Sequence, residues 1–200
     1  MFILLVLFSA LALGQTATLT APWLTVYDPA GRPRWEIRME KLVRTKEGWE
    51  GEGVSVTLFS AGAPLISVRA PRLSADPLGR NWSLSGGISG EGQGFSFSAE
   101  EARWMDRLIL IAFSGQREDL KVEAQEARWE LLGVIEFFSA KVTFSDWFLK
   151  FPYGKFVEAV LVAEDVEARG RGLRISADFL EFQVDKGRAK FLGAKVVRSS

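Results

Sequence analysis

The chain has 200 residues, enough for one domain with a sizeable core, and 48% of its residues are apolar. Lys and Arg number 25 and are balanced by 25 Asp and Glu, so no net positive charge favours nucleic acid or an anionic membrane surface. The sequence has no Cys and no His. This composition excludes disulfides, thiol nucleophiles, the usual Cys/His metal sites and Ser–His catalysis.

The N-terminal segment is strongly apolar. Its apolar run, Phe2 to Leu13, spans 12 residues, which is short for a membrane-spanning helix and typical of a signal-peptide core. Ala12-Leu13-Gly14 supplies small residues for a cleavage site, although no Lys or Arg precedes the run. We expect residues 1–21 to be a signal peptide or an anchoring helix that directs residues 22–198 across a cytoplasmic membrane. A buried core helix is the alternative.

One ten-residue pattern, apolar-x-apolar-x-Ala-x-x-apolar-x-apolar, recurs along the rest of the chain. Its copies are WEIRMEKLVR (35–44), ISVRAPRLSA (66–75), FSFSAEEARW (95–104), LKVEAQEARW (120–129), LKFPYGKFVE (149–158) and LRISADFLEF (173–182). The central positions are Met39, Ala70, Ala99, Ala124, Tyr153 and Ala177, 24 to 31 residues apart. A small residue follows four of these centres at the same distance: Gly86, Gly115, Ala140 and Gly193. Six copies in register indicate a repeat architecture.

The repeated phrase EARW alone would suit an amphipathic helix, but the other copies favour strands. FSFSA, ISVRA and LRISA alternate apolar and polar residues with period two and carry β-branched and aromatic residues. Because all copies share one template, we assign the EARW segments to strands as well. Residues 99–112 and 124–138 are where helix propensity opposes this prediction most strongly.

Six repeated strand pairs predict an all-β fold of roughly twelve antiparallel strands. Two architectures fit, an elongated open β-jelly-roll and a β-helix. In both, residues two apart in a strand face the interior. The inward positions are Trp35, Ile37, Ile66, Val68, Phe95, Phe97, Leu120, Val122, Leu149, Phe151, Leu173 and Ile175.

The sequence contains no convincing catalytic or cofactor motif. The Gly-rich stretches GWEGEGVS, SGEGQGFS and ARGRGLR do not open a helix within a βαβ unit, so we interpret them as turns. Asp146, Asp165, Asp178, Glu100 and Glu101 could serve a carboxylate-dependent lyase or glycosidase, but they fall at turns or outward positions. We expect no enzyme activity, no cofactor and no metal.

With its N-terminal apolar segment, the stretch VYDPAGRPRWEIRMEKL (26–42) resembles the opening of LptC, and ISADFLEFQVDKGRAKFLGAKV (175–196) resembles the repeat shared by LptC and LptA. These are the periplasmic lipopolysaccharide-transport bridge proteins with an OstA-like β-jelly-roll. The resemblance covers nearly everything after residue 23. It implies an open, V-shaped roll whose apolar interior shelters acyl chains as lipid passes from an inner-membrane ABC transporter toward the outer membrane.

The resemblance also implies the site and the partners. Phe95, Phe97, Trp104, Trp129, Phe151 and Phe182, together with the other inward positions, would line the lipid path, although such residues more often simply fill a core. Phe191, Ala194, Val196 and Val197 would belong to an edge strand that pairs with a second OstA-like bridge protein. Residues 23–27 and 35–39 would dock on the transporter. The cargo would be lipopolysaccharide or another envelope glycolipid, and the location would be the periplasm, with or without an inner-membrane tether.

A function of another class also fits the repeats. An exported structural or adhesive β-repeat protein would have the same alternation, with its aromatic residues closed into a dry core. The presence or absence of lipid inside the fold distinguishes the two hypotheses.

Overall fold

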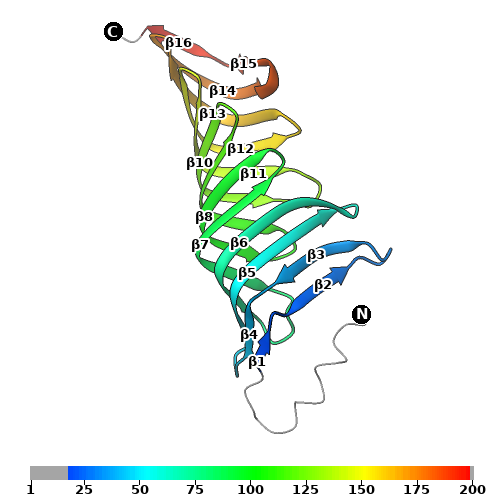
Figure 1. Cartoon of the computed structure of the whole chain (residues 1–200). Helices are drawn as coiled ribbons and strands as arrows, with labels where there is room; N and C mark the ends of the chain where they lie inside the picture. Colours follow the sequence, from blue (N-terminus) through cyan, green and yellow to red (C-terminus); the bar gives the residue numbers. More distant parts are fainter. Residues whose placement is uncertain (1–17, 199–200) are drawn as a thin grey trace.

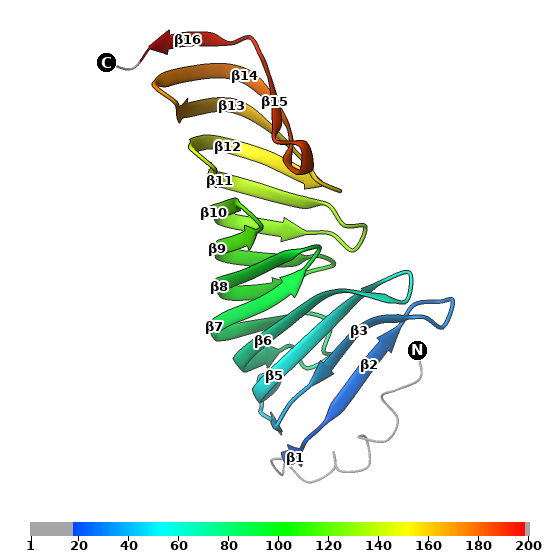
Figure 2. The ribbon, with the colours of Figure 1, turned by 45° about the horizontal axis from the view of Figure 1, so that its top comes forward.

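The strands form one continuous antiparallel sheet. The structure, a computed structural model, describes residues 18–198. In that range sixteen strands form the sheet, and from β4 to β15 each strand pairs with the next one along the chain. Figures 1 and 2 show the strands stacked from β1 and β2 at one end to β15 and β16 at the other. The all-β, antiparallel, open-sheet prediction is confirmed. The β-helix alternative is wrong, because consecutive strands pair as antiparallel hairpins rather than as parallel coils.

The elements have the following bounds: β1 (Thr18–Thr20), β2 (Trp23–Tyr27), β3 (Pro33–Arg38), β4 (Lys41–Arg44), β5 (Trp49–Ser60), β6 (Ala63–Ala75), β7 (Trp82–Gly92), β8 (Phe95–Trp104), β9 (Leu108–Arg117), β10 (Leu120–Trp129), β11 (Ile135–Phe144), β12 (Trp147–Val157), β13 (Val160–Gly170), β14 (Leu173–Gln183), the 3₁₀ turn η2 (Val184–Lys186), β15 (Arg188–Leu192) and β16 (Lys195–Arg198). Residues 18–198 contain no helix long and apolar enough to cross a membrane. The predicted signal or anchor helix falls mainly on residues 1–17, outside the described residues, whereas β1 lies within its last residues.

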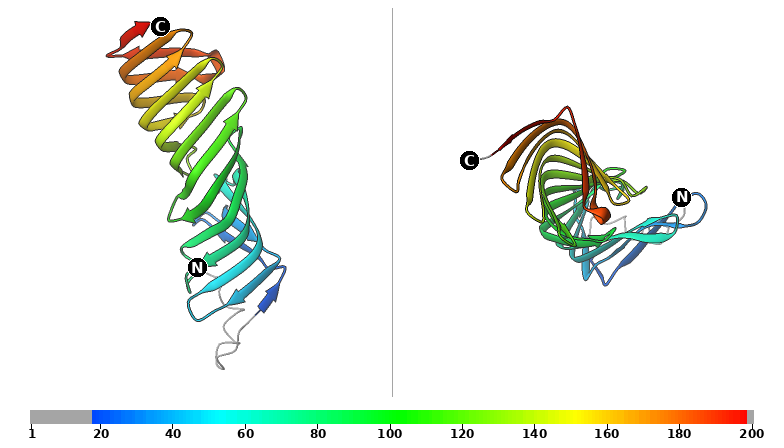
Figure 3. Two further views of the ribbon diagram at one scale, coloured as in Figure 1. Left: turned by 90° about the vertical axis from the view of Figure 1, so that its left-hand side faces the viewer. Right: turned by 90° about the horizontal axis from the view of Figure 1, so that it is seen from above.

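Each long strand bends once, at a residue that we call its corner. The ladder between β10 and β11 skips Gln125 and Ser139, and the ladder between β13 and β14 skips Asp165 and Asp178. Ser139 and Asp165 have φ values of 51° and 50°, in the left-handed region that turns a strand sharply. The corners line up from strand to strand and fold the sheet along its length, as the end-on view in Figure 3 shows.

The corners explain why there are sixteen strands rather than the roughly twelve expected. The corner divides two bent strands at the N-terminal end of the sheet, into β1 and β2 and into β3 and β4, and one at the C-terminal end, into β15 and β16. β3 and β4 pair with the two halves of β5, and β15 and β16 pair with the two halves of β14. Period-two alternation alone gives no sign of such a division.

The central residue of the repeat has a fixed place beside the corner. The residue before the corner faces inward and is buried, as at Ala99, Ala124 and Ala177. The corner residue and the residue after it both face away from the interior, so the alternation shifts by one position: in β8, Ala99 is followed inside by Ala102 and Trp104.

One repeat assignment was wrong in register. We placed Tyr153 at the central position of the fifth copy, but Phe151 pairs with Ala140 just as Ala124 does, and the corner is Pro152. Tyr153 therefore lies beyond the corner, where its hydroxyl donates a hydrogen bond to Glu136 at 2.8 Å. Pro cannot donate to the ladder and is tolerated at a bulge, so it fits a corner.

Candidate functional site

The corners divide the sheet into two arms. Arm A comprises the half-strands on the side of Phe95–Ala99 and Phe113–Arg117, and arm B those on the side of Glu101–Trp104 and Leu108–Ile111. Both arms turn their apolar side chains inward, toward each other. The apolar interior that the two arms form is the candidate functional site.

The predicted lining residues all belong to this interior. Ile37, Ile66, Val68, Phe95, Phe97, Leu120, Val122, Leu149, Phe151 and Ile175 are buried on arm A, and Trp104, Trp129 and Phe182 are buried on arm B. Trp35 and Leu173 are half-buried, and Trp35 packs against the core from β3. The structure thus brings these fifteen residues to one apolar face of a folded sheet.

Arm B carries a feature that the sequence interpretation captured only in part. One inward row of directly paired residues runs along the strand ends farthest from the corners: Trp49, Ala75, Trp82, Trp104, Leu108, Trp129, Ile135, Phe156, Leu161 and Phe182. We call it the aromatic row. Trp49, Trp82 and Phe156 were not among the predicted residues. The sequence signal that could have found them is their spacing: they lie at the same distance from the corner as the Trp of the two EARW copies.

Aromatic side chains of the two arms touch across the interior. Ring centroids are 5.4 Å apart for Phe97 and Trp129, and 5.2 Å apart for Phe95 and Phe156. In each pair the arm A ring contacts a row residue two or four strands further along. Rings at this distance contribute packing energy beyond their buried area. In this structure the arms are closed on each other, and Trp129 is 0% exposed.

Two arginines of arm A reach across to the aromatic row. Arg34 lies over the Trp104 ring at 5.7 Å and 3.9 Å from Asp106, in the turn that follows Trp104. Arg117 lies over the Phe156 ring at 5.5 Å, and its Nη2 is 3.3 Å from Asp185 Oδ1 in η2.

We call these two contacts the arginine bridges, and their residues have the same arrangement. In each, a cation from arm A covers an arm B ring and pairs with a carboxylate beyond the strand end of arm B. They join the arms at the side away from the corners.

The ends of the sheet expose apolar side chains. The predicted edge residues lie on or between β15 and β16: Phe191 is half-buried, while Ala194, Val196 and Val197 are exposed. Within residues 18–198, β15 and β16 pair only with β14. At the other end Trp23 of β2 is 63% exposed, under the guanidinium of Arg38. The predicted partner-pairing and docking segments thus lie at the two ends of the sheet.

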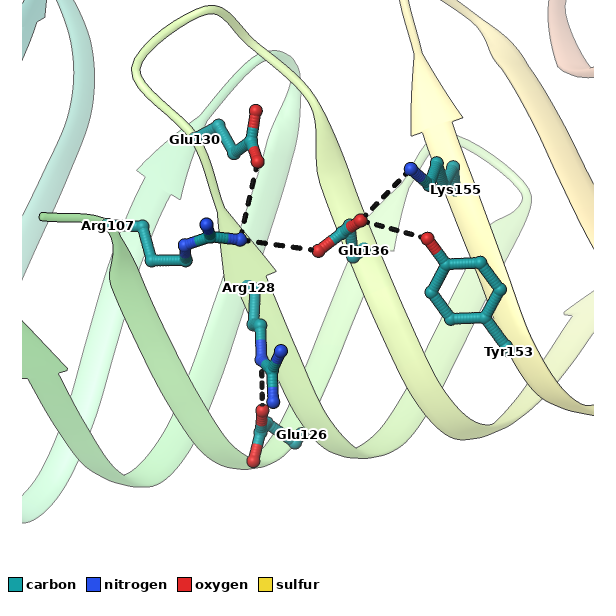
Figure 4. Close-up of polar contacts among 7 residues, drawn as sticks. All are labelled: Arg107, Glu126, Arg128, Glu130, Glu136, Tyr153 and Lys155. Atoms are coloured by element: carbon teal, nitrogen blue, oxygen red, sulfur yellow. Dashed lines mark hydrogen bonds and ion pairs between the residues drawn. The ribbon is translucent and has the colours of Figure 1, made fainter. Parts of the chain in front are cut away.

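The outer face of arm B holds a polar cluster, drawn in Figure 4. Glu136 accepts hydrogen bonds from Tyr153 and Lys155, at 2.8 and 3.1 Å, and lies 3.6 Å from Arg107, which also pairs with Glu130. Burial acts to raise the pKa of Glu136, but these donors and cations outweigh it and hold the pKa below its usual value. The pKa of Lys155 is raised by Tyr153 and Glu136. These contacts link four neighbouring strands, β9 to β12 with their turns.

The acids considered for catalysis are scattered. Glu100, Asp165 and Asp178 occupy corners, and Asp146 lies in the turn between β11 and β12. Glu101 pairs with Arg103 on the outer face, at 2.7 Å. In the described part of the chain, no group of three Asp or Glu residues is placed to hold a metal ion.

The sequence matches no protein-family model and no curated protein. Among solved structures, the sheet is similar to LptH of Pseudomonas aeruginosa, described as the LptA-homologous periplasmic component of the conserved lipopolysaccharide transport device. The identity is 7% and the TM-score 0.29, over 68% of this chain and 95% of that one.

Proposed function

We propose that this protein is a periplasmic lipid-transport bridge component that shelters the acyl chains of lipopolysaccharide, or of an equivalent envelope glycolipid, between its two arms. The supporting observation is an apolar interior that runs without interruption from β3 to β14, between two ends where the outermost strands lack a further pairing strand among residues 18–198. A closed globular core would need neither the length nor the open ends.

The energetics fit this role. Each CH₂ of an acyl chain that is exposed to water costs about 0.8 kcal/mol compared with the same CH₂ buried in an apolar environment. A folded sheet whose inner face is apolar along every strand covers the chain at each position with similar side chains. Cargo can then move along the interior without a large barrier at any single strand. Directionality must come from partners.

The proposed partners follow from the ends of the sheet. An edge strand with free N–H and C=O groups pairs readily with another strand. In our proposal, β15 and β16, with Val196 and Val197, join a second bridge protein of the same kind. The N-terminal strands dock on an inner-membrane ABC transporter, and residues 1–21 direct or tether the chain.

The test is site-specific photo-crosslinking in cells. A photo-reactive amino acid replaces Phe97, which is buried on the inner face, or Ser98, which is exposed on the outer face of the same strand. We expect a lipid adduct at position 97 and none at 98. A folded, exported protein without an adduct at 97 would refute lipid carriage.

A second candidate function has its own support. The ring contacts between the arms and the full burial of Trp129 are also expected of an exported structural β-repeat protein with a dry core. Such a protein would give no adduct at either position. Its backbone amides would exchange hydrogen at the same rate with and without added lipid.

A further inference from the structure

Two indole N–H groups in the aromatic row have no acceptor among residues 18–198. They are Nε1 of Trp82 and Nε1 of Trp129, on side chains 4% and 0% exposed. Buried N–H donors are nearly always paired, because leaving one unpaired forfeits the hydrogen bond that it would make in water. A third indole of the row is paired: Trp49 Nε1 donates to the Pro77 carbonyl at 3.4 Å.

The row does not need indoles at these positions for packing. Further along the same row, β12 and β14 place Phe156 and Phe182, which fill the interior without a donor. Trp129 is flanked in the row by Leu108 and Ile135, which offer no side-chain acceptor. A phenylalanine would serve there at no cost in unpaired polar groups, so the donors call for a role other than packing.

Surroundings differ between the two donors. Trp129 lies deep in the interior, against Phe97. Trp82 stacks on Trp104, with centroids 5.8 Å apart and planes 8° from parallel. Together with Trp104 it borders a surface depression whose other lining residues are mostly polar, such as Asn81 and Arg103. Trp82 thus lies near the surface, and Trp129 lies inside the apolar interior.

We propose that Trp82 and Trp129 bind acceptor oxygens of an acylated amphiphile, the ester, amide or hydroxyl oxygens that follow its polar head. This inference rests on the proposed lipid-transport function and specifies the cargo further: a lipid with polar linkages inside the fold, rather than a bare hydrocarbon chain. β7 and β10 are three strands apart, so the two donors are separated by roughly 14 Å along the sheet. A cargo moving along the interior would meet them in succession.

The first experiment compares two lipids that differ only in the acceptor. Exported full-length protein binds dipalmitoyl phosphatidylglycerol or its dihexadecyl ether analogue, which keeps the head and chain length but lacks the carbonyls. We expect W82F and W129F each to weaken ester-lipid binding about fivefold, the effect of one hydrogen bond, and to leave the ether analogue unchanged. W23F, whose indole is exposed under Arg38 and lies outside the aromatic row, is the matched control and should change neither lipid.

Several results would overturn the inference. One is equal binding of both lipids by the wild-type protein and both variants, and another is an equal loss in W23F. If neither lipid binds and Phe97 gives no adduct, the transport proposal fails with it. If Phe97 gives an adduct and the two lipids behave alike, only the donor role fails.

A second measurement reports on the indole N–H groups directly. The Raman band that reports indole N–H hydrogen bonding should shift in the wild-type protein when the ester lipid is added, and by less in W129F. A band already at the hydrogen-bonded position before lipid is added would mean that a buried water is the acceptor, and would overturn the inference. So would a band that does not move on loading.

Discussion

Replacing Arg117 with methionine should loosen the contact between the two arms. The substitution keeps most of the side-chain stem but removes the guanidinium that covers Phe156 and pairs with Asp185. Asp185 is 57% exposed, so solvent screens the ion pair, which contributes about 0.2–1 kcal/mol. The cation–π contact adds about 0.5–1 kcal/mol. Together they hold the arms closed by about 1–2 kcal/mol, roughly a 5- to 30-fold change in an opening equilibrium.

The assay is the rate at which a fluorescent lipid enters the purified protein, measured by stopped flow beside urea denaturation. R117M should speed entry by this factor, and D185N by less, since it leaves the contact with Phe156. High salt should narrow the difference between wild type and D185N. R103M is the control, because Arg103 pairs with Glu101 of its own strand on the outer face. The reasoning would be refuted if R103M and R117M accelerated entry equally, or if R117M left it unchanged.

Three further predictions concern stability. The fold lowers the pKa of Glu136, so the stabilising effect of its carboxylate is complete above the ordinary pKa of 4.5 and is lost as the pH falls through the lowered value. Between pH 6 and 3, the urea midpoint of E136Q should therefore fall less steeply than that of the wild-type protein. Equal pH dependence of the two midpoints would contradict this. A Cβ at Gly115 would lie 2.5 Å from Phe113 Cζ, so G115V should lose about 1–3 kcal/mol in thermal unfolding, and an unchanged midpoint would mean that the ring moves freely. Ala112 has a φ of 52°, so A112G should raise the free energy of unfolding by up to about 1 kcal/mol. A124G, at a buried strand position, should lower it by a similar amount. A lower free energy of unfolding in both variants would argue against a strained corner.

Local alternation was enough to predict the strands and most of the inner face. Phe95, Phe97, Leu120 and Val122 occupy the predicted inward positions because a strand has one side-chain period, and the repeat fixes its phase. The EARW segments became strands, β8 and β10, against their helix propensity. Each lies between two neighbours that pair with its backbone, and such tertiary pairing overrides local preference.

What could not be predicted depends on contacts distant in sequence. The corner is a change of backbone direction at residues as different as Glu100, Gln125 and Pro152, so no residue type marks it. The shift of phase after each corner was therefore missed, and with it the register of Tyr153. The arginine bridge of Arg117 depends on how far the folded sheet twists between β9 and η2, which no local pattern encodes.

The line of corners has a consequence for the size of the molecule. Every strand bends at the same point, so each added hairpin reproduces the cross-section and lengthens the sheet by about 10 Å. The number of hairpins therefore sets the length of the sheet, and this number can change while the strands at both ends stay the same. A variant that lacks one internal hairpin should fold with the same apolar interior. Its sheet should be shorter by about 10 Å, so it should fail to reach the partner protein by that length.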